Sequence, residues 1–218
     1  MPTPSPLFSD ADLRAVREAV AAAERGTSGE IVPYVVGASD DYPVAIWKGA
    51  ALGALTGALL GWWLHQFYGF WGASPFLWMV VPPAAGAALG YLAAHLAPVR
   101  RLLAGGQTLG RRVEARAAAA FLEQEVFRTR DRTGILLFLS LFERRVVVLG
   151  DSGIHAKVED GEWEVVVGHV VSGLRAGNPT SALVAAIREC GEILSRRGLP
   201  ARPDDDDELP DDLRWKDR

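Results

Sequence analysis

Three acidic residues lie where the sequence predicts the ends of strands. Asp131 precedes the apolar run 135–141, Glu143 follows that run, and Asp151 follows the next apolar run, 145–149. Loops beyond the strands of open α/β sheets commonly hold ligands. Because the two runs are close enough in sequence to form a hairpin, we expect Asp131 and Asp151 to approach one another.

Two carboxylates at such a place, together with backbone carbonyls and water, suit Ca²⁺ or Mg²⁺ better than Zn²⁺. The alternative is that they are ordinary turn acids, because Asp151 stands in a Gly-Asp-Ser-Gly turn that needs no metal. The sequence contains no P-loop, no Cys-x5-Arg loop and no Gly-x-Ser-x-Gly elbow. Cys190, the single cysteine, falls on an apolar helix face and is expected to be an inert core residue.

The elements that would position these residues alternate between helix and strand. Ser9 is expected to cap a first helix, and a strand over 30–36 contains Pro33, which favours an edge position or a bulge. Residues 135–141 are apolar throughout, as in a central strand covered on both faces. Further helices are expected over 109–127, over 163–174 despite its valines, and from Asn178-Pro179 to about residue 198.

Two long apolar runs interrupt this polar chain. Each run, 44–64 and 76–96, has 21 residues, which is about 31 Å of helix and enough to cross the hydrocarbon core of a bilayer. Aromatic residues crowd the short turn between them, as in the belt at a membrane interface. The sequence therefore predicts a transmembrane helical hairpin over 43–98.

Small residues recur every fourth position in both runs. This spacing favours close contact between helices in membranes, where packing must replace the hydrophobic effect. The first interpretation is that the two arms pack against each other, and the alternative is self-association through the same glycine face. The residues concerned are Gly49, Gly53, Gly57 and Gly61 in the first run, and Gly86 and Gly90 in the second.

Charge predicts the orientation of the hairpin and excludes one class of function. The turn carries no Lys or Arg, whereas Lys48 lies near the other interface and Arg100 and Arg101 follow the second arm. By the positive-inside rule, both termini and the soluble domain should face the cytoplasm of a multi-pass protein of the cell membrane. Residues 1–200 carry equal numbers of acidic and basic side chains, so we expect no nucleic-acid partner.

The chain is thus expected to divide into four parts. Residues 1–42 supply the first helix and strand of one soluble domain, 43–98 form the hairpin, and 99–200 complete the domain. The remaining residues, 201–218, hold eight acidic and four basic side chains and are expected to form a disordered tail. The hairpin is then an insertion within a single domain.

Four segments in this order and spacing resemble the TPM domain family, in particular its membrane-embedded bacterial members. They are SGEIV at 28–32, TGILLFLS at 133–140, ERRV at 143–146 and GDSGI at 150–154. The resemblance implies a three-layer α/β/α domain around a small mixed sheet, here interrupted by the hairpin. It also implies divalent-cation binding, calcium in some relatives, with Asp131, Asp151 and Glu143 as the matching positions.

Two departures from the family accompany the resemblance. Arg130 and Arg132 flank Asp131, where many relatives have a glycine-rich acidic loop with asparagine, and these arginines would oppose a cation. Many relatives also lie outside the cytoplasm and carry a trailing anchor, whereas this chain has its hairpin between the first strand and the next helix and is expected to face the cytoplasm.

The resemblance implies roles in maintaining or assembling membrane complexes, and weak acid phosphatase activity in some members. Two functions are therefore open. The first is a cation-binding accessory or assembly factor that recognises a membrane-protein partner, and the second is a metal-dependent acid phosphatase that uses Asp131 and Asp151 as ligands.

Overall fold

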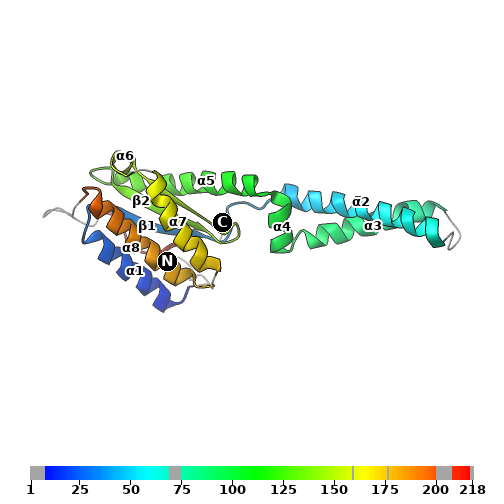
Figure 1. Cartoon of the computed structure of the whole chain (residues 1–218), viewed down its shortest axis with the longest axis horizontal. Coiled ribbons are helices and arrows are strands. Elements are labelled where there is room, and N and C mark those ends of the chain that lie inside the picture. Colours follow the sequence, from blue (N-terminus) through cyan, green and yellow to red (C-terminus); the bar gives the residue numbers. More distant parts are fainter. Residues whose placement is uncertain (1–7, 69–74, 159, 176, 200–207, 217–218) are drawn as a thin grey trace. The chain divides into compact units, whose positions relative to one another are not determined.

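A computed structural model describes residues 8–68, 75–158, 160–175, 177–199 and 208–216 of the chain. The chain forms two compact units, which are described separately below (Figure 1). The first unit combines Met1–Ser39 with Arg111–Arg218, and the second is Asp40–Gly110. Segments on both sides of the second unit in sequence therefore build the first.

The first unit has a mixed α/β fold around a four-stranded sheet. The strands are β1 (Glu30–Val36), β2 (Gly134–Ser140), β3 (Arg145–Gly150) and β4 (Arg214–Lys216), in the order β3-β2-β1-β4. β1 runs parallel to both β2 and β4, whereas β2 and β3 are antiparallel. The sheet is thus mixed, with β1 and β2 inside it.

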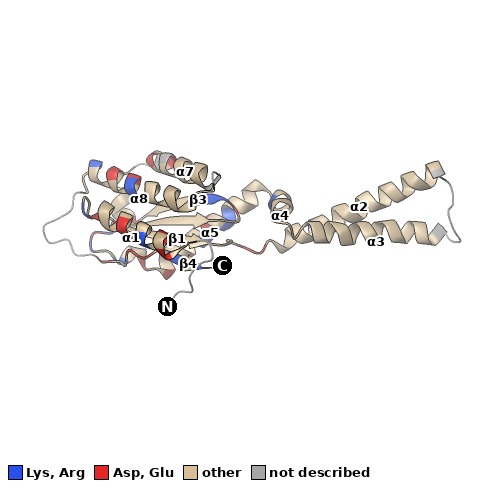
Figure 2. Ribbon diagram, turned by 90° about the horizontal axis from the view of Figure 1, so that it is seen from below, with Lys and Arg blue, Asp and Glu red and all other residues tan. Residues whose placement is uncertain are grey.

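Helices cover both faces of this sheet (Figures 1 and 2). On one face α1 (Asp10–Glu24), α7 (Asp160–Arg175) and α8 (Pro179–Arg196) pack against the odd-numbered residues of β1 and β2. On the other face α5 (Gly106–Glu123) packs against the even-numbered residues of the same strands. Every residue of β1 and β2 is buried, which explains the nearly continuous apolar sequence of β2. Two short helices, η1 (Val126–Arg128) and α6 (Ser152–His155), lie in the connections.

Several local expectations are confirmed. The Ser9 hydroxyl accepts the Asp12 N–H at 3.2 Å and begins α1. The valine-rich segment is helical as α7, because its apolar residues recur with helical period. Asn178 precedes α8, with Pro179 at its first position.

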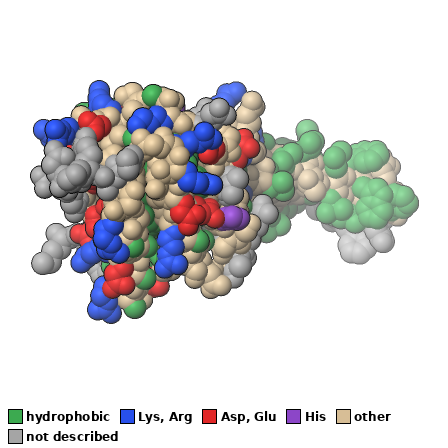
Figure 3. Space-filling view, turned by 60° about the vertical axis from the view of Figure 1, so that its left-hand side comes forward, with side chains coloured by type: hydrophobic (Ala, Val, Ile, Leu, Met, Phe, Trp, Pro, Cys, Tyr) green, Lys and Arg blue, Asp and Glu red, His purple; other side chains and the backbone are tan. Residues whose placement is uncertain are grey.

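The second unit is dominated by two long apolar helices packed as a hairpin. These are α2 (Pro43–Tyr68) and α3 (Pro75–Ala93), and α4 (Ala97–Ala104) follows them. Among the aromatic residues of the turn between the two apolar runs, Phe70 and Trp71 lie outside the described residues. By length and composition α2 and α3 could each cross a membrane, and apolar side chains cover the part of the hairpin seen in Figure 3.

The C-terminal segment differs from its prediction. Of the tail expected to be disordered, the structure describes 208–216, and there Arg214–Lys216 form β4. Leu213 is buried in the core between the sheet and α1, α7 and α8, and the Phe8 and Trp215 rings are in an edge-to-face arrangement with their centroids 6.1 Å apart. Apolar residues stand between the charged ones in this segment, and their burial stabilises it against the domain. The net charge of the segment gave no sign of this.

Candidate functional site

The β2–β3 hairpin separates the three predicted metal ligands. Asp131 precedes β2 and Asp151 follows β3, so both belong to one end of the hairpin. Glu143 lies in the turn at its other end. Since β2 has seven residues and a strand rises about 3.3 Å per residue, the two ends are roughly 20 Å apart. The structure therefore does not bring Glu143 to the other two carboxylates.

Asp151 caps α6 and is paired with an arginine. Its Oδ1 accepts the Ser152 N–H at 2.7 Å, and its Oδ2 lies 3.5 Å from Arg132 Nη1. The Asp151 side chain is only 12% exposed, whereas the Arg132 side chain that pairs with it is 54% exposed. The Arg132 carbonyl also accepts the Gly153 N–H at 3.0 Å, which joins the loop before β2 to the turn after β3.

The residues at this end do not fit a bound cation as they are arranged. Asp131 is exposed, and the Arg132 guanidinium stands beside Asp151, where it would repel a cation. Within the described residues no group of three or more His, Cys, Asp or Glu side chains could hold a metal ion. Ca²⁺ prefers six to eight oxygen ligands, so the loop would have to rearrange to supply them. Ca²⁺ or Mg²⁺ binding stays a prediction.

Glu143 has a structural position that sequence reasoning missed. It is buried, and its carboxylate accepts the Ser39 N–H at 2.9 Å and the hydroxyl of Ser140. The two serine hydroxyl oxygens lie 2.8 Å apart. Ser39 follows β1 and Ser140 ends β2, so Glu143 ties the carboxyl ends of two parallel strands together.

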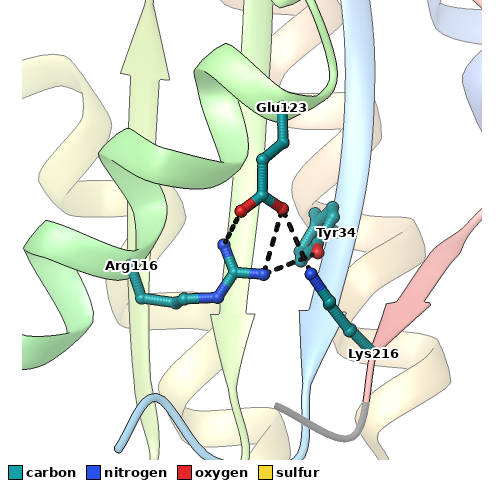
Figure 4. A network of polar contacts seen from close by, with 4 residues as sticks. All are labelled: Tyr34, Arg116, Glu123 and Lys216. Atoms are coloured by element: carbon teal, nitrogen blue, oxygen red, sulfur yellow. Dashed lines mark hydrogen bonds and ion pairs between the residues drawn. The ribbon is translucent and has the colours of Figure 1, made fainter.

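A second polar network joins α5 to β1 and β4 on the face of the sheet that α5 covers. Arg116 donates to the Tyr34 hydroxyl at 3.0 Å and to Glu123 Oε2 at 3.3 Å, and Lys216 Nζ lies 3.4 Å from the same oxygen (Figure 4). These residues come from α5, β1 and β4. The network fixes the C-terminal strand to the domain, and we assign it a structural role.

Cys190 is a core residue, as the sequence predicts. It is fully buried on α8, and burial raises the pKa of its thiol to about 12. The thiolate is therefore scarcely populated at neutral pH, which makes nucleophilic chemistry at this position unfavourable.

The glycines of the hairpin face one another across its two helices. A Cβ atom added at Gly53 would overlap the carbonyl of Gly86, and one added at Gly90 would overlap the carbonyl of Gly49. Gly57 approaches Pro82 in the same way, and Gly61 meets the Pro82 ring. Helix backbones can approach this closely only where side chains are absent.

Comparisons with known proteins agree with this architecture. Residues 99–193 match the model of the TPM domain, which spans β2, β3, α7 and most of α8. The NMR structure of the BA42 protein from the psychrophilic bacterium Bizionia argentinensis is similar, with a TM-score of 0.59 and 18% sequence identity. That comparison covers 99% of this chain and 100% of BA42, and at this identity it shows a shared fold alone. None of the curated proteins matches the chain.

The family match begins after the hairpin, although β1 comes before it and pairs with β2 along its whole length. The fold of the matched region is thus completed by N-terminal residues. Residues 99–193 of this chain are therefore a TPM domain.

Proposed function

We propose that this protein is a membrane-anchored accessory or assembly factor for membrane protein complexes. In this proposal α2 and α3 cross the cell membrane, and a three-layer TPM domain on the cytoplasmic side recognises a membrane-protein partner. The observation that carries the proposal is the apolar surface of the hairpin.

That surface is extensive. Only 17% of the most apolar window of α2, and none of that of α3, is buried inside the protein. Large side chains lie on it with more than half of their area exposed, among them Trp47, Leu59, Met79 and Leu89. Most of the hairpin also lacks acidic and basic residues, which gather on the other unit (Figure 2). Exposing such a surface to water is unfavourable by about 25 cal/mol per Å², and a bilayer removes that cost.

The glycine contacts support the same proposal. Lipid tails are as apolar as leucine, so helices in a bilayer associate through close packing. We propose that Gly49, Gly53, Gly57, Gly86 and Gly90 hold the two arms together, in preference to self-association through the same face. Gly53→Leu should separate the arms, whereas Ala51→Leu, at an exposed position of the same helix, should not. Protease digestion in detergent would distinguish the two variants, because the hairpin should lose its protease resistance in Gly53→Leu and keep it in Ala51→Leu.

The non-enzymatic role is favoured over the phosphatase alternative by the surroundings of Asp151. A metal-dependent phosphatase would need Asp131 and Asp151 to hold a cation, and Arg132 opposes this. Titration calorimetry of the full chain with Ca²⁺ tests the shared cation premise. Heat that disappears in Asp151→Asn would support a site there, and turnover of a phosphate ester that disappears in Asp131→Ala would replace our proposal by the enzymatic one.

Membrane insertion can be tested by fractionation of cells that express the full chain. The protein should stay with the membranes after alkaline carbonate extraction. Leu55→Arg combined with Leu89→Arg should abolish this, because each arginine near the bilayer centre costs about 3 kcal/mol. Leu122→Arg, at an exposed position of α5, is the matched control and should remain in the membrane. A wild-type protein released by carbonate would contradict the proposal.

Orientation requires a separate experiment with an impermeant maleimide on intact cells. In a Cys190→Ala background, Gln66→Cys at the turn end of α2 should be labelled, and Glu164→Cys on the TPM domain should not. The reverse pattern would place the domain outside the cytoplasm.

A further inference from the structure

β3 is an edge strand of the sheet. In the described part of the chain β3 pairs on one side only, with β2. The Asp151 N–H donates to the Gly134 carbonyl at 2.9 Å, which fixes the alternation of the antiparallel ladder. The backbone N–H and C=O groups of Val146, Val148 and Gly150 therefore point outward, away from β2.

An apolar groove of about 580 Å³ adjoins this edge. Val148 from β3 lines it together with Trp163, Val167 and Val171 from α7. Gly168 lies on the same wall, and a Cβ added there would meet no atom within 4 Å. A strand added beside β3 would direct every second side chain toward α7, so the groove has the position needed to receive apolar residues at alternate positions.

Charge at the start of β3 restricts what this groove accepts. Arg144 and Arg145 are both exposed at that end of the strand. Glu164 is exposed on the α7 side of the groove. A segment that pairs with β3 would therefore be favoured if it carried acidic residues beside the two arginines and no acidic residue beside Glu164.

We infer that the β3 edge and the α7 groove bind an extended segment of a partner protein, which joins the sheet as an additional strand. Apolar side chains of that segment fill the groove at alternate positions, and an acidic residue lies beside Arg144 and Arg145. The inference rests on the accessory role proposed above, and it names the surface of the TPM domain that performs it.

The experiment uses the full chain in nanodiscs and a library of random octapeptides displayed on phage. We expect enrichment of sequences with apolar residues at alternate positions and an adjoining acidic residue. Gly168→Phe adds a ring to the groove wall at a position where a Cβ meets no atom within 4 Å, and it should weaken binding of a selected peptide by at least about tenfold. Gly161→Phe is the matched control, since it also adds a ring in open space on α7 but lies outside the groove, and it should bind normally.

Charge provides the second arm of the test. Arg145→Glu should weaken binding of the selected acidic peptides by about three- to tenfold, and replacing the acidic residue of the peptide by lysine should restore binding to this variant. Failure to enrich any peptide family, or equal binding to the Gly168→Phe and Gly161→Phe variants, would overturn the inference.

Self-association has a distinct outcome. If the chain dimerises without peptide and Gly168→Phe abolishes the dimer, the occupant of the groove is a second copy, and the partner-segment inference is wrong. Carbonate extraction reports membrane anchoring independently of these results. Failure of the docking surface can thus be distinguished from failure of the proposed membrane-anchored role.

Discussion

The outer side of β1, of which β4 covers only Tyr34–Val36, differs from the outer side of β3 in how the chain treats the backbone groups. On the β1 side, the Ile31 N–H donates to Glu24 at 2.7 Å, Pro33 has no N–H, and the Gly37 N–H donates to the Lys216 carbonyl at 3.1 Å. On the β3 side, alternate N–H groups point outward beside an apolar groove. Unpaired edges invite pairing with other chains, and proteins usually protect them.

This contrast suggests that the open edge is a surface for recognition. The same chain covers the outer side of β1 with a carboxylate, a proline and the C-terminal strand β4. The edge that it leaves unpaired carries the groove and two arginines. Protection of β1 and exposure of β3 would then serve different purposes, stability on one side and binding on the other.

Truncating Leu213, the buried residue directly before β4, should have the largest effect on stability. Leu213 is buried in the core, so Leu213→Ala should lower the free energy of unfolding by about 2 to 4 kcal/mol. The measurement is urea unfolding of the full chain in detergent micelles. Leu122→Ala, at an exposed position, is the control, and an equal effect of both changes would contradict the assigned role of the C-terminal segment.

Opening the β1 edge at Ile31 should have a smaller effect. Glu24→Ala leaves the Ile31 N–H without its carboxylate acceptor, which should cost about 1 to 3 kcal/mol. Glu18→Ala, an exposed acid on the same helix, should change stability little. Indistinguishable unfolding midpoints for the two variants would show that the carboxylate does not protect this edge.

Filling space at the β3 edge should stabilise the protein slightly. Gly168→Ala places a methyl group in open space and removes a glycine from a helix, so stability should rise by about 0.5 to 1 kcal/mol. Gly173→Ala on the same helix should instead lower stability, because its Cβ would overlap that of Ala182. Thermal unfolding of the two variants should shift in opposite directions, and a shift in the same direction would mean that position 168 is not open.

The smallest expected effect concerns an ion pair of the C-terminal segment. Arg17 and Asp212 are in contact, but their side chains are 58% and 61% exposed. Exposed pairs contribute little, so Asp212→Asn should change stability by at most about 1 kcal/mol. A larger loss in urea unfolding would mean that charge, rather than burial of Leu213, holds the segment in place.

Much of the fold could be predicted from residue patterns. The period of Trp163, Val166 and Val170 specifies a helix, the apolar run of β2 specifies an inner strand, and Pro33 favours an edge. β1 is an inner strand of the sheet, but β4 pairs only with Tyr34–Val36, so the outer side of Pro33 is unpaired by β4 and the missing N–H is tolerated there. Each of these signals depends on residues close together in the sequence, so it can be recognised without knowledge of the tertiary contacts.

The remainder depends on long-range contacts. β4 has three residues, Arg214, Trp215 and Lys216, and neither their number nor their charge distinguishes a strand from a solvated tail. The only hint was the spacing of Leu209, Leu213 and Trp215 among the acidic residues. For the candidate site, the sequence placed Asp131 and Asp151 near strand ends but gave no sign of the Arg132 contact or of the serine partners of Glu143, because both arise from tertiary packing.

Hydrogen exchange resolved at single amides tests the contrast between the edges most directly. In the full chain, without any added peptide, the Gly37 and Val147 amides should be protected, because Gly37 pairs with β4 and Val147 with β2. The Val148 amide should exchange much faster than that of its neighbour Val147. Equal protection of Val147 and Val148 would contradict the account, because it would mean that the β3 edge is already closed.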